Sequence, residues 1–178
     1  NPLGINGNVD KIPFYPYLIF KDLFSWVAFF VMYIAFVCFA PNYLGHSDNY
    51  IEANAMVTPA HIVPEWYFLP FYAILRSIPH KLGGVIAMFA ALLILLLLPY
   101  TGTSEVRSSS FRPLHRIIFW ILVLDYFVLG WIGGCAPESP YLEVGQIATF
   151  FYFFYFIGLL PLLGVFESYL LSYSLEEK

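Results

Sequence analysis

Four long apolar runs dominate the pattern of this chain, and shorter polar or proline-rich stretches separate them. The runs cover residues 23–40, 83–98, 117–134 and 142–171. A helix needs about 20 mostly apolar residues to cross a bilayer, and each run is near that length or longer. The pattern therefore predicts an all-α integral membrane fold with four transmembrane helices.

Proline and glycine residues punctuate these runs. Residues 1–20 place several prolines beside aromatic side chains, which predicts an irregular interfacial lead-in. Pro99 follows the second run and is expected to end that helix. Gly158, Pro161 and Gly164 lie inside the fourth run and are expected to bend it.

The 41–82 loop, between the first two runs, contains the apolar stretch Val63–Arg76. At this length it is too short to cross a bilayer as a helix, so it predicts an amphipathic interfacial helix. Pro64 suits the first turn of such a helix. Pro70 lies deeper, removes an internal hydrogen bond and is expected to kink the segment.

Glu65, Phe68 and Tyr72 follow helical spacing in this stretch and would share one face. That face would present an acid, an aromatic ring and a phenol, which suits a flat, redox-active ring. A hydrophobic interfacial helix with one charged residue explains the same spacing. Both interpretations stay open on spacing alone.

Composition agrees with a membrane protein. Of 178 residues, 60% are hydrophobic, 21% aromatic and 11% charged, whereas soluble domains carry about 25% charged residues. A net charge of −4 gives no reason to expect nucleic acid. Cys38 and Cys135 form no paired motif, so neither a metal site nor a c-type haem is predicted.

Basic residues orient the four predicted helices. One side would carry six of them: Lys11, Lys21, Arg107, Arg112, Arg116 and Lys178. The other side would carry only Arg76 and Lys81. The positive-inside rule then predicts that the 41–82 loop faces the positive side of the membrane.

The motif Pro64-Glu65-Trp66-Tyr67 and its setting resemble a known family. The stretches at 44–50 (LGHSDNY) and 72–79 (YAILRSIP) match the same family in the same order. The chain resembles the C-terminal half of cytochrome b of ubiquinol–cytochrome c reductase, nearly from end to end. The resemblance implies one membrane domain over residues 1–178.

The resemblance implies a quinol oxidation site in the 41–82 loop, with Glu65 and Tyr72 as its catalytic residues. The implied site residues are Ile62, Pro64, Glu65, Tyr67, Phe68 and Tyr72. In the family mechanism, quinol gives one electron to the iron–sulfur protein and one to a b haem, and two protons leave outward. Glu65, as a carboxylate at a helix start, suits the role of general base.

The resemblance also implies part of a quinone reduction site at Phe14, Lys21 and Asp22. Phe14 would pack on the quinone, and Asp22 would help to bind it. A structural explanation stays open, because Asp favours a helix N-terminus and Lys extends toward lipid headgroups.

The implied docking surface for the Rieske iron–sulfur protein includes Thr58, His61 and Lys81. Without the resemblance, His61 is equally well a loop histidine with no role. Ser47 and Ala55 stand where the family usually has proline, which changes the stiffness of this loop.

The implied ligands and partners follow from the same resemblance. Ubiquinol and ubiquinone are the expected substrates, and two b-type haems are expected on the N-terminal half of cytochrome b. Other expected partners are the Rieske protein, cytochrome c1 and membrane lipid, in a homodimeric complex of the mitochondrial inner membrane or bacterial plasma membrane. We expect the chain to be inactive alone.

Three alternatives remain. Subunit IV of the plastoquinol–plastocyanin enzyme shares the Pro64–Tyr67 motif but ends after three helices. A non-redox structural or ion-conducting subunit, or a transporter, would explain the apolar runs without quinone chemistry. Asp125, inside the third run, has no assigned role. We expect the sequence to be a fragment, a processed product or one part of a protein made in two pieces.

Overall fold

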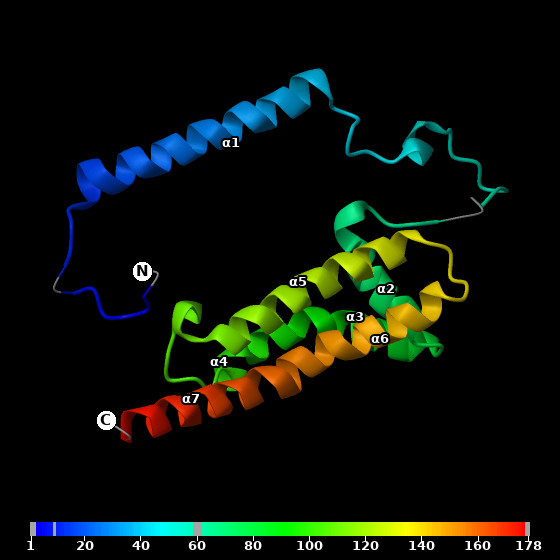
Figure 1. Cartoon of the computed structure of the whole chain (residues 1–178). Coiled ribbons are helices and arrows are strands. Elements are labelled where there is room, and N and C mark those ends of the chain that lie inside the picture. Colours follow the sequence, from blue (N-terminus) through cyan, green and yellow to red (C-terminus); the bar gives the residue numbers. More distant parts are fainter. Residues whose placement is uncertain (1–2, 9, 59–61, 177–178) are drawn as a thin grey trace. The chain divides into compact units, whose positions relative to one another are not determined.

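The computed structural model describes residues 3–8, 10–58 and 62–176, and within these ranges it contains helices and loops but no strand (Figure 1). The α-helices are α1 (Ile19–Phe39), α2 (Leu69–Ser77), α3 (Lys81–Leu93), α4 (Leu98–Thr101), α5 (Pro113–Gly134), α6 (Tyr141–Phe154) and α7 (Leu160–Glu176). The 3-10 and π segments are η1 (Phe14–Leu18), η2 (Ser47–Tyr50), η3 (Trp66–Phe68), η4 (Ile94–Leu97), η5 (Ser109–Phe111) and η6 (Tyr155–Leu159). The predicted all-α class is confirmed.

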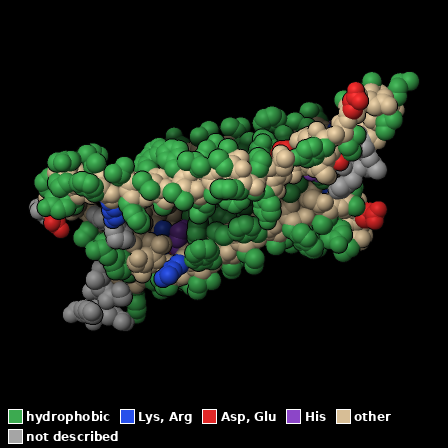
Figure 2. All heavy atoms as spheres, turned by 90° about the horizontal axis from the view of Figure 1, so that it is seen from above, with side chains coloured by type: hydrophobic (Ala, Val, Ile, Leu, Met, Phe, Trp, Pro, Cys, Tyr) green, Lys and Arg blue, Asp and Glu red, His purple; other side chains and the backbone are tan. Residues whose placement is uncertain are grey.

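Four helical segments of the described chain are long and apolar enough to cross a membrane. They are Phe14–Phe39, Lys81–Thr101, Pro113–Gly134 and Tyr141–Tyr173. Apolar side chains cover most of the face shown in Figure 2, whereas charged side chains gather toward the ends of the helices. The four predicted spans are therefore confirmed in number, order and apolar surface.

Two helix ends differ from the prediction. The first regular helix begins at Ile19, four residues before the predicted run, and it follows a short segment, Phe14–Leu18, in which Tyr15 has an extended backbone. The second span continues through Pro99 to Thr101. The backbone tightens into η4 just before this point, and Pro99 then occupies the first turn of α4.

The fourth span is interrupted near the residues that were predicted to bend it, and the bend itself stays a prediction. Residues Tyr155–Leu159 form a π segment between α6 and α7. Pro161 cannot donate the hydrogen bond that a regular helix requires, and such interruptions accompany proline and π segments. Gly164 has a different role, because a Cβ there would collide with the Thr103 hydroxyl.

The chain divides into two compact units, one formed by residues 5–59 and the other by residues 60–178 with the first four. None of the described residues of the 5–59 unit is buried. The larger unit has a core contributed by α2, α3, η4, α5, α6 and η6. Its most deeply buried large side chains are Ile74, Leu129 and Ile132.

Candidate functional site

The short helix α2 is the element around which the candidate site is built. Its buried residues are Pro70, Ala73, Ile74 and Ser77, at the i, i+3, i+4 and i+7 positions that share one helical face. This face packs against α5, α3 and α6. Nine residues suffice for a stable helix here because tertiary packing, and not length, supports it.

Two glycines allow the backbone of α2 to approach its neighbours closely. A Cβ at Gly133 of α5 would collide with the carbonyl oxygen of Leu69, and a Cβ at Gly84 of α3 would collide with that of Leu75. Small residues permit such close helix contacts in membrane proteins. Both ends of α2 therefore rest directly on neighbouring backbones.

Buried hydrogen bonds hold the C-terminal end of α2. The Ser77 hydroxyl lies 2.9 Å from the Thr149 hydroxyl of α6 and donates to the Ala73 carbonyl at 2.7 Å. The Gln146 side-chain amide donates to the Ser77 carbonyl at 3.1 Å. These bonds satisfy polar groups inside an apolar bundle, where unpaired groups are costly.

The helix begins later than the spacing predicted. Pro64 and Glu65 lie ahead of it, and Glu65 has an extended backbone. Trp66–Phe68 form a 3-10 turn, in which the Leu69 N–H donates to the Trp66 carbonyl. That bond satisfies the carbonyl that Pro70 cannot reach, so Pro70 falls in the first turn of α2 and does not kink it.

The predicted single face of Glu65, Phe68 and Tyr72 is therefore wrong as helix geometry. Glu65 precedes the 3-10 turn, Phe68 ends it and Tyr72 lies one turn into α2. The aromatic side chains of the turn remain more than half exposed: Trp66 60%, Tyr67 51% and Phe68 51%. Within this chain, the turn presents an acid and three rings on an open surface.

Arg76 connects Tyr72 to the end of α5, a contact that sequence reasoning missed. The Arg76 guanidinium donates to the carbonyls of Cys135 at 2.7 Å and Ile132 at 2.9 Å. Its central carbon lies 5.2 Å from the centroid of the Tyr72 ring. The Tyr72 hydroxyl lies 3.5 Å from the carbonyl oxygen of Ile62. The only signal in the sequence is the four-residue spacing of Tyr72 and Arg76.

The residues predicted for quinone reduction lie in the 5–59 unit, with the extended backbone of Tyr15 between Phe14 and the helix that carries Lys21 and Asp22. Phe14 opens η1 with 62% of its surface exposed, and Lys21 and Asp22 are exposed in the first turns of α1. Asp22 lies in the first turn of α1, where a negative charge is favoured. The structure thus keeps Phe14, Lys21 and Asp22 within one unit.

The predicted docking residues are only partly described. Thr58 is exposed in the loop of the 5–59 unit, and Lys81 is exposed as the first residue of α3. His61 lies outside the described residues. His80 caps α3, because its Nδ1 accepts a hydrogen bond from the Gly83 N–H at 3.2 Å.

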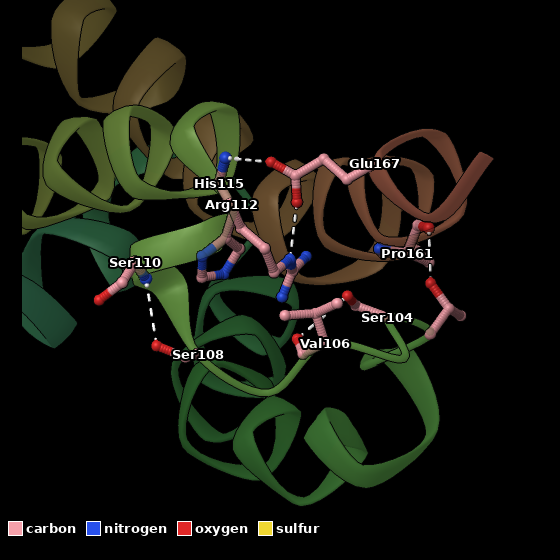
Figure 3. A network of polar contacts seen from close by, with 9 residues as sticks. Ser104, Val106, Ser108, Ser110, Arg112, His115, Pro161 and Glu167 are labelled. Atoms are coloured by element: carbon pink, nitrogen blue, oxygen red, sulfur yellow. Dashed lines mark hydrogen bonds and ion pairs between the residues drawn. The ribbon is translucent and has the colours of Figure 1, made fainter. Parts of the chain in front are cut away.

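A second polar cluster joins the 102–112 segment, between α4 and α5, to α7 (Figure 3). Arg112 and Glu167, both buried, form an ion pair at 2.6 Å, and Glu167 also accepts from the His115 N–H at 2.9 Å. The Thr103 hydroxyl donates to the Pro161 carbonyl at 2.8 Å. Glu167 was not among the predicted site residues, although an acid inside an apolar run signals a buried partner.

No metal site was predicted, and among the described residues no three His, Cys, Asp or Glu side chains gather as metal ligands. Two described histidines have local side-chain contacts, since His46 Nδ1 accepts from the Asp48 N–H and His80 caps α3, whereas His115 Nδ1 is buried without a hydrogen-bond partner in the described structure. The Asp125 side chain, on α5, has an oxygen that is buried without a hydrogen-bond partner in the described structure. Haem ligation by another polypeptide stays a prediction.

Comparisons with known proteins agree on one family. A family model described as "Cytochrome b(C-terminal)/b6/petD" matches residues 52–153. The chain is 59% identical over 175 residues to cytochrome b of Chondrus crispus, covering 98% of this chain and 46% of that protein. It is 61% identical to cytochrome b of Marchantia polymorpha (98% and 43% covered) and 52% identical to that of Rickettsia bellii (94% and 42%).

A solved structure extends the similarity to the fold. A chain of a "Hyperthermophilic respiratory Complex III" matches with a TM-score of 0.84 and 35% identity, covering 94% of this chain and 44% of that one. The chain spans about half the length of the curated relatives it matches.

Proposed function

Because this chain belongs to the cytochrome b family, whose C-terminal part it matches, we propose that it forms part of the quinol oxidation site of a membrane quinol–cytochrome c reductase. Four spanning helices and the similarity to a respiratory complex III support a role in membrane electron transfer. The subunit would act within a multisubunit enzyme and not alone.

The observation that carries the proposal is the contrast between the two ends of the stretch from Glu65 to Ser77. Its C-terminal end is locked into the bundle by packing and hydrogen bonds. Its N-terminal end offers the Glu65 carboxylate and the half-exposed rings of Tyr67 and Phe68. An acid and aromatic rings on a rigid support suit a planar substrate that must lose protons.

Oxidation of quinol to quinone releases two electrons and two protons. We propose that the Glu65 carboxylate takes one of these protons from a quinol hydroxyl as a general base. Ile62, Pro64, Tyr67, Phe68 and Tyr72 would form the wall against which the ring lies. Quinol cannot easily lose its second electron while it keeps its proton. Removal of the proton acceptor should therefore lower the maximal rate more than it weakens quinol binding.

The electron acceptors would lie on other chains. When bound by the N-terminal half of cytochrome b, b-type haems would supply one-electron acceptors within the membrane. The Rieske iron–sulfur protein would accept the other electron, and we propose Thr58, His61 and Lys81 as part of its docking surface. Cytochrome c1, membrane lipid and a second copy of the assembly complete the proposed partners.

A second part of the proposal concerns quinone reduction. Phe14, Lys21 and Asp22 would contribute to that site, with Asp22 delivering a proton to the quinone oxygen. Residues 1–178 would form one membrane domain, with the loop before α2 on the positive side of the mitochondrial inner membrane or bacterial plasma membrane.

Replacement of Glu65 tests the proposal directly. We expect Glu65→Gln to lower the maximal rate of quinol–cytochrome c turnover roughly ten- to a hundred-fold and to leave quinol affinity little changed. Steady-state kinetics of the complete enzyme across pH would measure both. Glu138→Gln, in the exposed loop after α5, is the matched control and should keep the wild-type rate.

A wild-type rate and an unaltered pH profile in Glu65→Gln would contradict the proposal. Glu65 would then be a charge ahead of a helix, and a non-redox structural role for the chain would account for its apolar helices equally well. The control separates a specific effect of Glu65 from a general effect of removing a carboxylate on this side of the protein.

A further inference from the structure

We propose that Arg76 is a positioning residue that holds the Tyr72 ring in the orientation required for quinol oxidation. The inference rests on the proposed function, because it concerns the same pocket, and adds to it a residue outside the site predicted from sequence. It follows from a continuous set of contacts that runs from the end of α5 through Arg76 to the Tyr72 ring.

The first contact fixes the guanidinium. The last carbonyls of a helix carry partial negative charge and can accept further hydrogen bonds. At the end of α5, the Ile132 carbonyl also accepts from the Cys135 N–H. Arg76 donates to two carbonyls where α5 ends, those of Ile132 and Cys135, through its two terminal nitrogens. Two donors in one rigid plane set both the position and the tilt of the group.

The second contact transfers that position to the ring. Tyr72 and Arg76 are four residues apart on α2, so they lie one above the other on one face. The separation of 5.2 Å between the guanidinium carbon and the ring centroid is within the range of a cation–π interaction. One face of the ring is thus covered by a cation that cannot move freely.

Tyr72 is partly buried, and its hydroxyl is weakly held. Its hydroxyl lies 3.5 Å from the Ile62 carbonyl, at the far limit of a hydrogen bond, and that carbonyl is in an exposed segment. The buried face of α2 points away from Tyr72 toward α3, α5 and α6. The guanidinium therefore restrains the face of the ring that it covers.

A lysine at position 76 would keep the charge but lose the restraint. An ammonium on a flexible stem presents no planar pair of donors and cannot bind both carbonyls while it lies flat over the ring. The effect of Arg76→Lys on quinol oxidation should therefore require the ring of Tyr72. This requirement distinguishes positioning from general stabilisation of the bundle.

A double-mutant cycle in the complete enzyme tests the inference, with Arg76→Lys, Tyr72→Leu and the double variant. We expect Arg76→Lys alone to lower kcat/KM for quinol about fivefold, in line with a desolvated cation–π contact. In the Tyr72→Leu background the same change should lower it less than about twofold. Arg116→Lys, an exposed control at the start of α5, should leave the rate unchanged.

The quinone reduction rate of the same preparations is the second measurement. A positioning role lowers the oxidation rate alone, whereas damage to the bundle lowers both rates. If Arg76→Lys lowers kcat/KM for quinol by the same factor with and without the Tyr72 ring, the inference is overturned. A wild-type rate in Tyr72→Leu would overturn both the inference and the proposed role of Tyr72. A slow Tyr72→Leu variant in which the effects of the two substitutions are simply additive would overturn the inference but leave the proposed function standing.

If the enzyme with Arg76→Lys does not assemble, a further pair of variants tests the inference. Tyr72→Phe keeps the ring face that the guanidinium covers, and Tyr72→Leu removes it. The inference requires Tyr72→Leu to lower the rate clearly more than Tyr72→Phe does. An equal loss in both would assign the function to the hydroxyl and overturn the role of Arg76.

Discussion

The two candidate quinone sites differ in how much of their own support the chain supplies. The stretch around α2 rests on two glycine contacts, a buried hydroxyl pair and an arginine that binds the end of α5. The segment with Phe14 and Asp22 belongs to a helix without a buried residue. One site has its support within its own unit, whereas the other presents its residues in a unit with no buried residue among those described.

This contrast predicts different responses to mutation. The positions of the side chains at the α2 site depend on residues that are distant in the same polypeptide. Substitutions in α5 or α6 should therefore alter the geometry of this site. Phe14 and Asp22 belong to a unit with no buried residue among those described, so we expect their geometry to depend on the rest of cytochrome b. The predictions below test that distinction.

The largest effect is expected for Gly133→Ala. The new Cβ would collide with the Leu69 carbonyl, which belongs to the backbone and cannot rotate away. Overpacking of this kind costs about 1–3 kcal/mol. We expect lower thermal stability and a loss of quinol oxidation of about tenfold or more, because α2 must shift, while reduction at the Asp22 site continues.

Gly134→Ala is the matched control, since its Cβ would meet only the Leu69 side chain, at 3.9 Å. It should behave like wild type in thermal unfolding and in both quinone reactions. Equal stability of the two variants would contradict the close contact. An equal loss of both quinone reactions in Gly133→Ala would contradict the independence of the two sites.

The sequence predicted the spans but not the contacts that hold the site. Apolar runs of about 20 residues are a strong local signal, so the four helices were predicted correctly. The start of α2 was predicted too early, because a 3-10 turn satisfies the Trp66 carbonyl and moves Pro70 into the first turn. Helix spacing alone does not reveal such a turn.

Long-range polar pairs were beyond the reach of local patterns. Arg112 and Glu167 are 55 residues apart, and Arg76 reaches carbonyls more than 50 residues away. A count of basic residues treats Arg76 and Arg112 only as topology signals. Knowledge of which helices are neighbours is needed before either arginine can be assigned a partner.

A smaller effect is expected for Asp22→Asn. If Asp22 delivers a proton to quinone, its loss should slow re-oxidation of the b haem that feeds the reduction site by about tenfold. This is below the usual range for a general acid, because water can reach an exposed position and replace the carboxyl in part. Flash kinetics of the complete enzyme would measure the haem signal.

Asp10→Asn is the control for Asp22→Asn, because Asp10 is an exposed acid of the same unit that lies outside the helix. It should leave haem re-oxidation unchanged. Unchanged kinetics in Asp22→Asn as well would assign Asp22 a structural role at the start of α1. The contrast between the two sites would then rest on the α2 site alone.

The smallest effect is expected for Ser77→Ala, which weakens the support of α2 without touching its open side. The change removes the hydrogen bond to Thr149 inside the bundle and should lower the free energy of unfolding by about 1 kcal/mol. The Thr149 hydroxyl can turn to a carbonyl of its own helix, which keeps the cost low. Ser172→Ala, whose exposed hydroxyl donates to the Tyr169 carbonyl, should cost less in a thermal melt. Quinol oxidation should stay near wild type in both variants, because Ser77 lies on the buried face of α2 and Tyr72 does not. A large loss of quinol oxidation in Ser77→Ala would mean that the position of Tyr72 depends on the packing of α2 as a whole and not on Arg76.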